Sequence, residues 1–423
     1  MLKLMSNKQI TAVRGTTDWF DQAMILFNAI SHKIIALSDL YTFQRIKTPV
    51  FEHAELFSRN LEHSDIVKKE LYQLIDRSER KLALRPEGTA SIIRAVNEHK
   101  LLDQNPWPLK LYYLEPMFRY ERPQKGRMRE FYQYGIELVG ELDQLDYLQT
   151  ILFAKKILDT FNFDCVLNIN WLGNFASRKC WVEQLNQYFK QYQDQLSELS
   201  VSRLDSYGVL RILDDKNESK KDFVRSAPTI DQFISLEEQT QFKQLLEQLD
   251  QLGIKYKYNS SLVRGLDYYS ELVFEFILAN NDQAQSTLIG GGCYQNLIAE
   301  LTNKPLKAIG FALSIERFIS YLDDKTKDSL INQDQKPRYL LINLVPNKEL
   351  ATLNLSQELI NHNYQVYYQH KLNKVDKAIK YALRAKFTHL IIMGNDEWSK
   401  QTMTIKDLSS QTQQTIKYKE FIK

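Results

Sequence analysis

Two stretches in which apolar and polar residues alternate with period two, joined by a short polar loop, constrain the fold of this 423-residue chain most strongly. Residues 110–121 read KLYYLEPMFRYE and residues 130–140 read EFYQYGIELVG, with the loop PQKGRMR before the second stretch. Period-two alternation is typical of a strand with one buried face, and the turn-rich loop predicts an antiparallel hairpin. We therefore expect an antiparallel sheet.

The two faces of this hairpin differ in chemistry. One face is apolar, and the other carries Glu115, Met117, Arg119 and Glu121 on the first strand and Gln133, Gly135 and Glu137 on the second. Arginine is also concentrated here: the chain has 19 arginines among 55 basic residues, and four of them lie between positions 119 and 129. A guanidinium group binds phosphate or carboxylate with two parallel hydrogen bonds. The pattern favours a ligand-binding face over an ordinary solvated face.

The chain as a whole divides into four parts. Residues 1–165 and 259–330 alternate helical patterns with strand-like runs and predict one α+β domain. Residues 166–258 predict a mostly helical insertion without a chemical motif, and 331–338 predict a linker. Residues 339–423 alternate strand and helix, which is typical of a small α/β domain with a largely parallel sheet.

Charge, cysteine content and hydropathy indicate the compartment of the protein and the kind of partner it binds. Residues 337–423 hold 13 Lys and Arg against 7 Asp and Glu, which predicts a polyanionic partner or a lysine-rich solvated surface. Cys165, Cys180 and Cys293 form no C-x-x-C motif and indicate a reducing compartment. We see neither a run of about 18 apolar residues nor a signal peptide, and we expect a cytoplasmic protein without a membrane partner.

Six motifs occur in a fixed order along the chain. They are RGTTD (14–18), KTPVFE (47–52), LRPEGTASIIRA (84–95), FRYERPQKGRMREFYQYGIELVG (118–140), LVRGLDYYSELVFEF (262–276) and AIGFALSIERF (308–318). The set resembles the histidyl-tRNA synthetases, which are class II aminoacyl-tRNA synthetases, and the tail resembles their anticodon-binding domain. The resemblance implies a class II antiparallel sheet flanked by helices, with a helical insertion and a C-terminal α/β anticodon-binding domain.

The same resemblance implies a reaction: L-histidine and ATP form histidyl-adenylate and pyrophosphate, and the histidine passes to the 3′ end of tRNA(His). Both reactants of the first step are anions, so positioning and charge neutralisation carry most of the catalysis. The resemblance places Arg119 and Arg264 on the α-phosphate, Arg317 on the γ-phosphate and Glu121 on the adenine side. Mg²⁺ is expected with the ATP, and its ligands are unknown.

The resemblance further implies a pocket that reads both nitrogens of an imidazole. Glu137 and the hydroxyl of Tyr269 match the residues that read them. The remaining histidine-binding residues implied are Glu87, Gly88, Thr89 and Gln133 near the ammonium group, Tyr268 and Tyr294 as walls, and Arg119 and Arg264 near the carboxylate. Arg122, Gln124 and Arg129 match positions that approach the tRNA acceptor end. KTPVFE resembles the dimer-interface motif and implies a homodimer.

Three positions depart from the family pattern. GGCYQ stands where the family usually has GGRYD, so Cys293 and Gln295 replace an arginine and an aspartate, and Ser314 replaces a glycine. A non-catalytic regulatory subunit or a sensor of uncharged tRNA remains an alternative with the same fold. Retention of all three catalytic arginines and of a C-terminal domain argues against it. LVRGLDYY and Glu137 argue against another class II synthetase.

Overall fold

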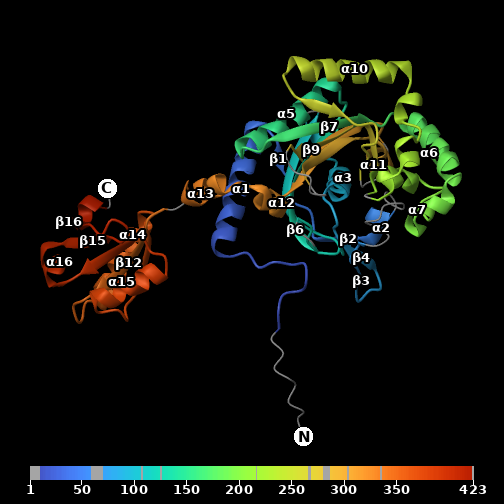
Figure 1. Cartoon of the computed structure of the whole chain (residues 1–423). Coiled ribbons are helices and arrows are strands. Elements are labelled where there is room, and N and C mark those ends of the chain that lie inside the picture. Colours follow the sequence, from blue (N-terminus) through green and yellow to red (C-terminus); the bar gives the residue numbers. More distant parts are fainter. Residues whose placement is uncertain are drawn as a thin grey trace, which may run out of the picture. The chain divides into compact units, whose positions relative to one another are not determined.

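A computed structural model of the chain describes residues 10–58, 70–105, 108–123, 126–215, 217–264, 268–279, 286–302, 304–333 and 336–421 (Figure 1). The chain forms two compact units, Met1–Ile331 and Asn332–Lys423. The larger unit is built on an eight-stranded sheet in the order β1-β5-β6-β11-β10-β9-β7-β8. These strands are β1 (Gln44–Arg45), β5 (Leu109–Phe118), β6 (Glu130–Gly140), β7 (Cys165–Trp171), β8 (Tyr256–Tyr258), β9 (Tyr269–Leu278), β10 (Thr287–Tyr294) and β11 (Lys307–Ser314).

The sheet is antiparallel except at its two edges, where β1 pairs with β5 and β8 pairs with β7 in parallel. The expected hairpin is β5 and β6, with Glu115 opposite Gln133 and Leu111 opposite Glu137. The next strand, β11, places Gly310 opposite Glu137. The prediction of an antiparallel sheet flanked by helices is confirmed.

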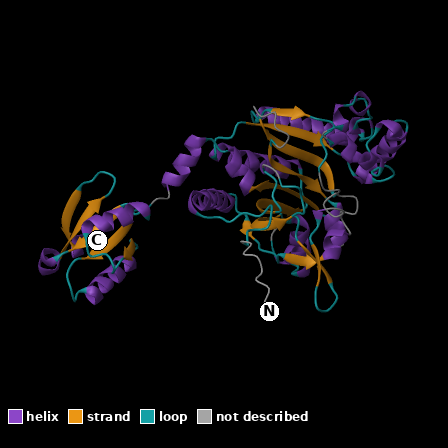
Figure 2. Ribbon diagram, turned by 60° about the horizontal axis from the view of Figure 1, so that its bottom comes forward, coloured by secondary structure: helices purple, strands orange, loops and turns teal. Residues whose placement is uncertain are grey.

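Helices cover this sheet (Figure 2). Apart from those between β7 and β8, the α-helices that the structure describes up to residue 333 are α1 (Asp21–Leu40), α2 (Ala54–Ser58), α3 (Thr89–Glu98), α4 (Leu101–Gln104), α5 (Gln144–Thr160), α11 (Asn296–Thr302), α12 (Ile315–Tyr321) and α13 (Asp324–Gln333). A small sheet of β2 (Phe51–His53), β4 (Lys81–Leu84) and β3 (Gln73–Ile75) lies beside α2 in Figure 1. The fully buried Arg85 joins these parts, because its guanidinium donates to Thr48 O at 2.8 Å and pairs with Glu115 at 3.1 Å.

Helix α1 is long and apolar enough to cross a membrane when judged by length and composition alone, and it is the one such helix among the described residues. A buried stripe that includes Leu26, Ile30 and Ile34 runs along it. Its Ser38 hydroxyl lies 2.7 Å from that of Tyr134 on β6. Packing against the main sheet therefore accounts for the apolar residues of α1.

The segment predicted as a helical insertion begins and ends with strands of the main sheet, β7 and β8. Between them lie α6 (Phe175–Lys190), α7 (Glu198–Val201), α8 (Leu210–Asp214), α9 (Asp222–Arg225) and α10 (Leu236–Gln251). Ser235 and Glu238 form a capping box at the start of α10. Glu238 also accepts hydrogen bonds from Asn174 N and the Ser177 hydroxyl, which joins the starts of α6 and α10.

The smaller unit has a five-stranded sheet in the order β13-β12-β14-β15-β16. Its elements are β12 (Arg338–Asn343), α14 (Glu349–Asn361), β13 (Gln365–Tyr368), α15 (Val375–Arg384), β14 (His389–Met393), α16 (Asn395–Lys400), β15 (Thr402–Asp407), β16 (Gln413–Lys417) and α17 (Tyr418–Phe421). Strand β12 is parallel to β13 and β14, as expected, whereas β15 and β16 are antiparallel. The apolar run of β12 is buried on both faces, with Leu341 in one core and Leu340 in another.

Candidate active site

A cavity of about 310 Å³ lies over the strands at the middle of the main sheet. Arg119, Arg264 and Arg317 all line it, although 145 residues separate the first two. Its lining holds four arginines, with Arg127 as the fourth, against two glutamates, Glu121 and Glu275. This surplus of positive charge makes the cavity suited to a ligand with several negative charges.

Arg119 follows β5 directly, and contacts to its Nε and to the flat face of its guanidinium fix its side chain. Its Nε donates to Pro86 O at 2.8 Å, and the group lies over the ring of Phe131, 5.2 Å from the ring centroid. Its Nη1 is 3.9 Å from the Glu121 carboxylate. Fixing Nε and the flat face leaves the Nη atoms as donors for a ligand.

Arg264 enters the same cavity from the segment before β9. Its Nη1 pairs with the Glu275 carboxylate, and Thr287 donates to the other carboxylate oxygen at 3.0 Å. A Cβ atom added to Gly290 would lie 2.4 Å from the Arg264 guanidinium, so only glycine leaves room for it at this point of β10.

Arg317 is positioned by the first turn of α12. Its Nη1 donates to Thr287 O at 2.9 Å and its Nη2 to Gly126 O at 3.2 Å. Burial and the neighbouring cations Arg127 and Arg119 lower the pKa of Arg317. Within the described part of the chain, the buried Nε atoms of Arg264 and Arg317 have no hydrogen-bond partner. Donors and charge therefore remain for an anion.

A buried carboxylate network contains most of the other predicted site residues. Glu137 on β6 is 2% exposed; Thr89 donates to its Oε1 at 2.7 Å, and Tyr294 donates to its Oε2 at 2.6 Å. A Cβ atom on Gly310 would lie 2.2 Å from the same carboxylate. Burial raises the pKa of Glu137 to about 8, with a smaller contribution from the nearby Glu87.

Glu87 occupies the N-terminus of α3. Its carboxylate accepts hydrogen bonds from Thr89 N at 2.6 Å and Ala90 N at 2.9 Å. Burial raises the pKa of this carboxyl, although the two backbone donors and Arg119 oppose the shift. The motif LRPEGT thus supplies a helix-terminal carboxylate, Glu87, and a side chain that reaches Glu137, Thr89.

Tyrosines pack around the network. Tyr268, Tyr269 and Tyr294 are buried with their rings in contact, and the Tyr268 and Tyr294 centroids are 5.2 Å apart. The ring of Tyr269 fills the space beside Gly292, where a Cβ atom would lie 2.8 Å from it. The charge of Arg264 interacts with Tyr269, which links the network to the arginine cavity.

The sequence reasoning did not identify Tyr113 as part of the site. Its buried hydroxyl donates to Gln133 Oε1 at 3.0 Å, and Gln133 lines the arginine cavity. A Cβ atom on Gly88 or Gly135 would lie within about 2.5 Å of the Tyr113 ring. Glu275 and Gly290 were also missed. The signal for Tyr113 was its place on the polar face of the hairpin; Glu275 carries no comparable signal.

Two of the loop residues expected to approach tRNA, Arg122 and Arg129, do not line the cavity. Arg122 is exposed, and Arg129 lies over the Tyr120 ring with its Nε 3.3 Å from Glu121 O. Gln124 lies outside the described residues.

The departures from the family pattern have distinct surroundings. Cys293 points away from the cavity, with its thiol 3.2 Å from the Tyr147 hydroxyl. Ser314 lines the cavity and caps α12: its Oγ accepts from Arg317 N and donates to Glu316. Gln295 immediately precedes α11.

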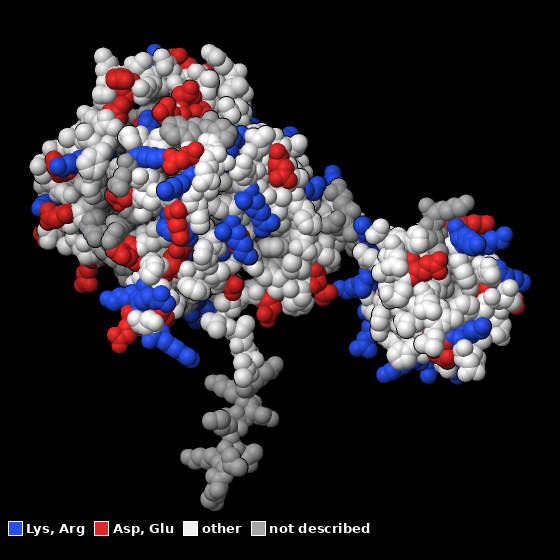
Figure 3. All heavy atoms as spheres, turned by 180° about the vertical axis from the view of Figure 1, so that it is seen from behind, with Lys and Arg blue, Asp and Glu red and all other residues white. Residues whose placement is uncertain are grey.

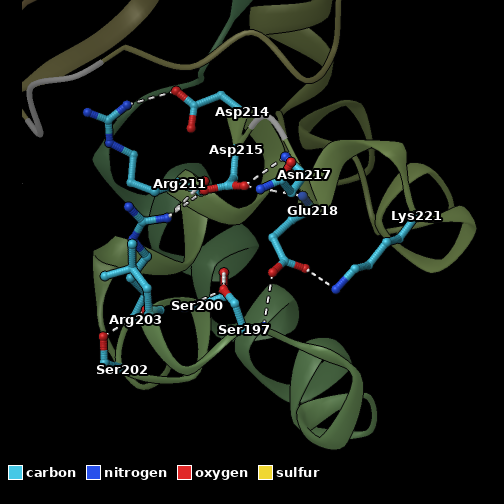
Figure 4. Close-up of polar contacts among 11 residues, drawn as sticks. Ser197, Ser200, Ser202, Arg203, Arg211, Asp214, Asp215, Asn217, Glu218 and Lys221 are labelled. Carbon is cyan, nitrogen blue, oxygen red and sulfur yellow. Dashed lines mark hydrogen bonds and ion pairs between the residues drawn. The ribbon is translucent and has the colours of Figure 1, made fainter.

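A second cavity of about 760 Å³ shares Arg119, Arg264 and Glu275 with the first. Its far wall belongs to the helical insertion, where Arg211 pairs with Asp214 at 2.8 Å and Arg203 with Asp215 at 3.6 Å (Figure 4). Burial raises the pKa of Asp214, the positive charges of Arg211 and Arg203 oppose the shift, and Glu275 adds to it. The insertion therefore forms a wall of the approach to the arginine cavity.

The raised pKa of Glu137 predicts a pH-dependent stability. Because the folded carboxyl holds its proton up to pH 8 and the unfolded one only to about pH 4.5, this contribution is complete below pH 4.5 and is lost as the pH rises through 8. The loss has an upper limit of about 5 kcal/mol. Urea unfolding between pH 5 and 8.5 measures it. Glu137→Gln should flatten the dependence, and equal slopes in both proteins would contradict this assignment.

Similarity to solved structures identifies the class of this fold. The apo histidyl-tRNA synthetase of S. aureus is 28% identical with a TM-score of 0.80, and the match covers 98% of this chain and 99% of that one. The histidyl-tRNA synthetase from Nostoc sp. PCC 7120 has a TM-score of 0.68 at 19% identity, with 98% of each chain covered. The antiparallel sheet with its arginine-lined cavity is that of a class II aminoacyl-tRNA synthetase.

Sequence comparison narrows the class. The histidyl-tRNA synthetase family model matches residues 15–318, and the anticodon binding domain model matches residues 340–423. A histidine–tRNA ligase of Ureaplasma urealyticum is 44% identical over 423 residues, covering 99% of both chains. One from Malacoplasma penetrans is 41% identical over 411 residues, covering 96% of both. The chain belongs to the histidyl-tRNA synthetase family.

Proposed function

We propose that the chain is an ATP-dependent histidine–tRNA ligase, which converts L-histidine and ATP into histidyl-adenylate and pyrophosphate and then transfers histidine to the 3′ end of tRNA(His). One observation carries the proposal in this family member: arginines from three distant segments line one cavity beside a buried carboxylate. A regulatory protein that does not catalyse adenylate formation does not require these three arginines in one cavity.

The arginine cavity takes the two anionic groups that react. Arg119 and Arg264 bind the α-phosphate of ATP and the histidine carboxylate, so that the carboxylate oxygen reaches phosphorus without electrostatic repulsion. Arg317 binds the γ-phosphate and stabilises the departing pyrophosphate. Glu121 orients the adenine side. The unpartnered Nε atoms of Arg264 and Arg317, counted among the described residues, support these roles.

The carboxylate network takes the histidine side chain. Glu137 and Tyr269 hydrogen-bond the two imidazole nitrogens, while Tyr268 and Tyr294 form the walls. The ammonium group lies near Glu87, Gly88, Thr89 and Gln133. Because an apolar amino acid of similar size forms no hydrogen bond with Glu137 or Tyr269 in this buried site, such competitors are rejected.

Magnesium enters with ATP in this proposal. When bound, it would be held by phosphate oxygens together with one or two protein carboxylates, and it would neutralise phosphate charge. Glu121 and Glu275 are the carboxylates that line the cavity, so the site fits a metal held mainly by the nucleotide. Among the described residues no cluster of three His, Cys, Asp or Glu side chains forms a metal site independent of the substrate.

The smaller unit binds the anticodon of tRNA(His), and the hairpin loop with Arg122, Gln124 and Arg129 approaches the acceptor end. Lys and Arg side chains are spread over the face of the smaller unit seen in Figure 3, in keeping with a polyanionic partner. Residues 1–165 with 259–330 form the catalytic domain, 166–258 the insertion and 331–338 the linker to residues 339–423.

The protein works as a homodimer in the cytoplasm. Large apolar side chains of the small sheet that carries part of the dimer motif are exposed, among them Phe51 at 56% and Ile75 at 70%. Such exposure is typical of an interface that a second copy covers. Sedimentation velocity, which gives the mass of the assembly, tests this point.

Deleting residues 337–423 should separate the two steps of the reaction. Histidine-dependent ATP–pyrophosphate exchange should stay within about two-fold, because the smaller unit supplies none of the residues of the arginine cavity. Charging of tRNA(His) should fall by about ten-fold or more, since many phosphate and base contacts are lost. Full charging by the truncated protein would contradict the role of the smaller unit.

Attachment of radiolabelled histidine to tRNA(His) in the presence of ATP tests the function itself. The proposal requires stable incorporation that depends on both ATP and tRNA. A regulatory subunit or a sensor of uncharged tRNA binds tRNA without incorporation, and that result would reject the enzyme.

A further inference from the structure

Strand β9 contains an irregularity directly beside the proposed histidine pocket. Gly292 on β10 lies opposite Val273, but Tyr294, two residues further, lies opposite Tyr269. Strand β9 thus has two more residues than β10 between these pairs. Within this bulge Glu271 has φ of 54°, a left-handed conformation that costs a non-glycine residue about 1 kcal/mol or more.

Contacts from three different parts of the fold hold Glu271 in this conformation. Its N donates to Gly173 O at 2.9 Å, and its O accepts from Leu172 N at 2.6 Å. Its carboxylate accepts from the Tyr147 hydroxyl of α5 at 2.6 Å and pairs with Lys307 of β11 at 2.6 Å. The carboxylate side chain is 13% exposed. These contacts offset the backbone strain at Glu271, which indicates that its conformation serves a function.

The bulge determines where the pocket tyrosines lie. In a regular strand Glu271 shares a face with Tyr269, because alternate residues point the same way. Here the Glu271 carboxylate reaches toward Tyr147 and Cys293, while the Tyr269 ring packs beside Gly292 and Tyr294. The left-handed turn therefore separates the two side chains and aims the Tyr269 ring into the pocket.

We infer that Glu271 is a positioning residue for histidine binding: braced by Lys307 and Tyr147, it fixes the bulge that places Tyr268 and Tyr269 against the substrate imidazole. The inference rests on the proposed function. Glu271 itself does not touch the substrate. Loss of the Lys307 or Tyr147 contact lets Tyr268 and Tyr269 move relative to Glu137, which weakens histidine binding. The arginines proposed to bind ATP keep their contacts with the protein.

Histidine-dependent ATP–pyrophosphate exchange tests the inference with Glu271→Gln and Lys307→Met, which break the same ion pair from opposite ends. Each should raise KM for histidine by about ten-fold, with kcat and KM for ATP within about two-fold, because one charge-assisted hydrogen bond is lost. The double variant should be no worse than either single variant. Asp103→Asn is the control: it removes the exposed Lys304–Asp103 pair, which lies outside the site, and should change none of these constants.

An unchanged KM for histidine in Lys307→Met would overturn the inference. The inference would also be overturned if KM for histidine, KM for ATP and kcat all worsened to the same extent while the melting temperature fell. A purely structural ion pair gives that result. Absence of histidine-dependent exchange in the unaltered protein would instead reject the proposed function, so the two failures are distinguishable.

Discussion

Replacing Arg264 with alanine should slow histidine-dependent ATP–pyrophosphate exchange by about 100- to 1000-fold, the effect of removing one preorganised donor to a transition-state charge. Arg264 provides a buried, unpartnered Nε among the described residues and lies in the same cavity as Arg119 and Arg317. The loss should fall mainly on kcat, because negative charge on the α-phosphate increases as the carboxylate attacks.

Arg94→Ala provides the matched control for this variant. Arg94 also pairs with carboxylates, Glu52 and Glu98, and its side chain is 25% exposed against 22% for Arg264, but it does not line the cavity. Removing Arg264 leaves the negative charge of Glu275 without its cationic partner. The double variant Arg264→Ala with Glu275→Gln therefore separates the catalytic effect of Arg264 from the effect of this unpaired charge. Exchange near the normal rate in either Arg264 variant would refute the catalytic role.

Glu137→Gln should lower kcat/KM for histidine by about 10- to 100-fold, the usual effect of losing a hydrogen bond to a charged group. The amide retains the shape of the protonated carboxyl that burial favours in the empty site, so the fold should persist. It cannot become the carboxylate that pairs with the imidazole of bound histidine. KM for ATP should remain within about two-fold.

Glu130→Gln is the control on the same strand, β6, because Glu130 is half-buried and lies outside the carboxylate network. Initial exchange rates with varied histidine at saturating ATP measure the effect. An equal change in both variants, or a normal constant in Glu137→Gln, would remove Glu137 from the recognition of histidine.

The hairpin was the part of the fold that could best be predicted from the sequence. Alternation along β5 and β6 assigned Arg119, Gln133 and Glu137 to one face, and the observed pairing of Glu115 with Gln133 puts both strands in that register. The alternation of apolar and polar residues depends only on neighbouring positions in a strand, so it predicts the two faces wherever one face is buried. Resemblance supplied the distant members, Arg264 and Arg317.

The unpredicted parts depend on contacts between distant segments. The Glu275 partner of Arg264 and the ring of Tyr113 over Gly88 and Gly135 follow from the order of strands in the sheet, which composition does not reveal. The Glu271 bulge breaks the alternation on which a strand is predicted. Strands β15 and β16 were missed because their polar, glutamine- and threonine-rich residues give a weak apolar alternation.

A crystal structure with histidine and a non-hydrolysable ATP analogue would show where both substrates bind. We expect α-phosphate oxygens within hydrogen-bond distance of both Arg119 and Arg264, the γ-phosphate on Arg317, and the imidazole between Glu137 and Tyr269. A nucleotide bound away from these guanidinium groups, or histidine bound outside the Glu137 pocket, would contradict this expectation.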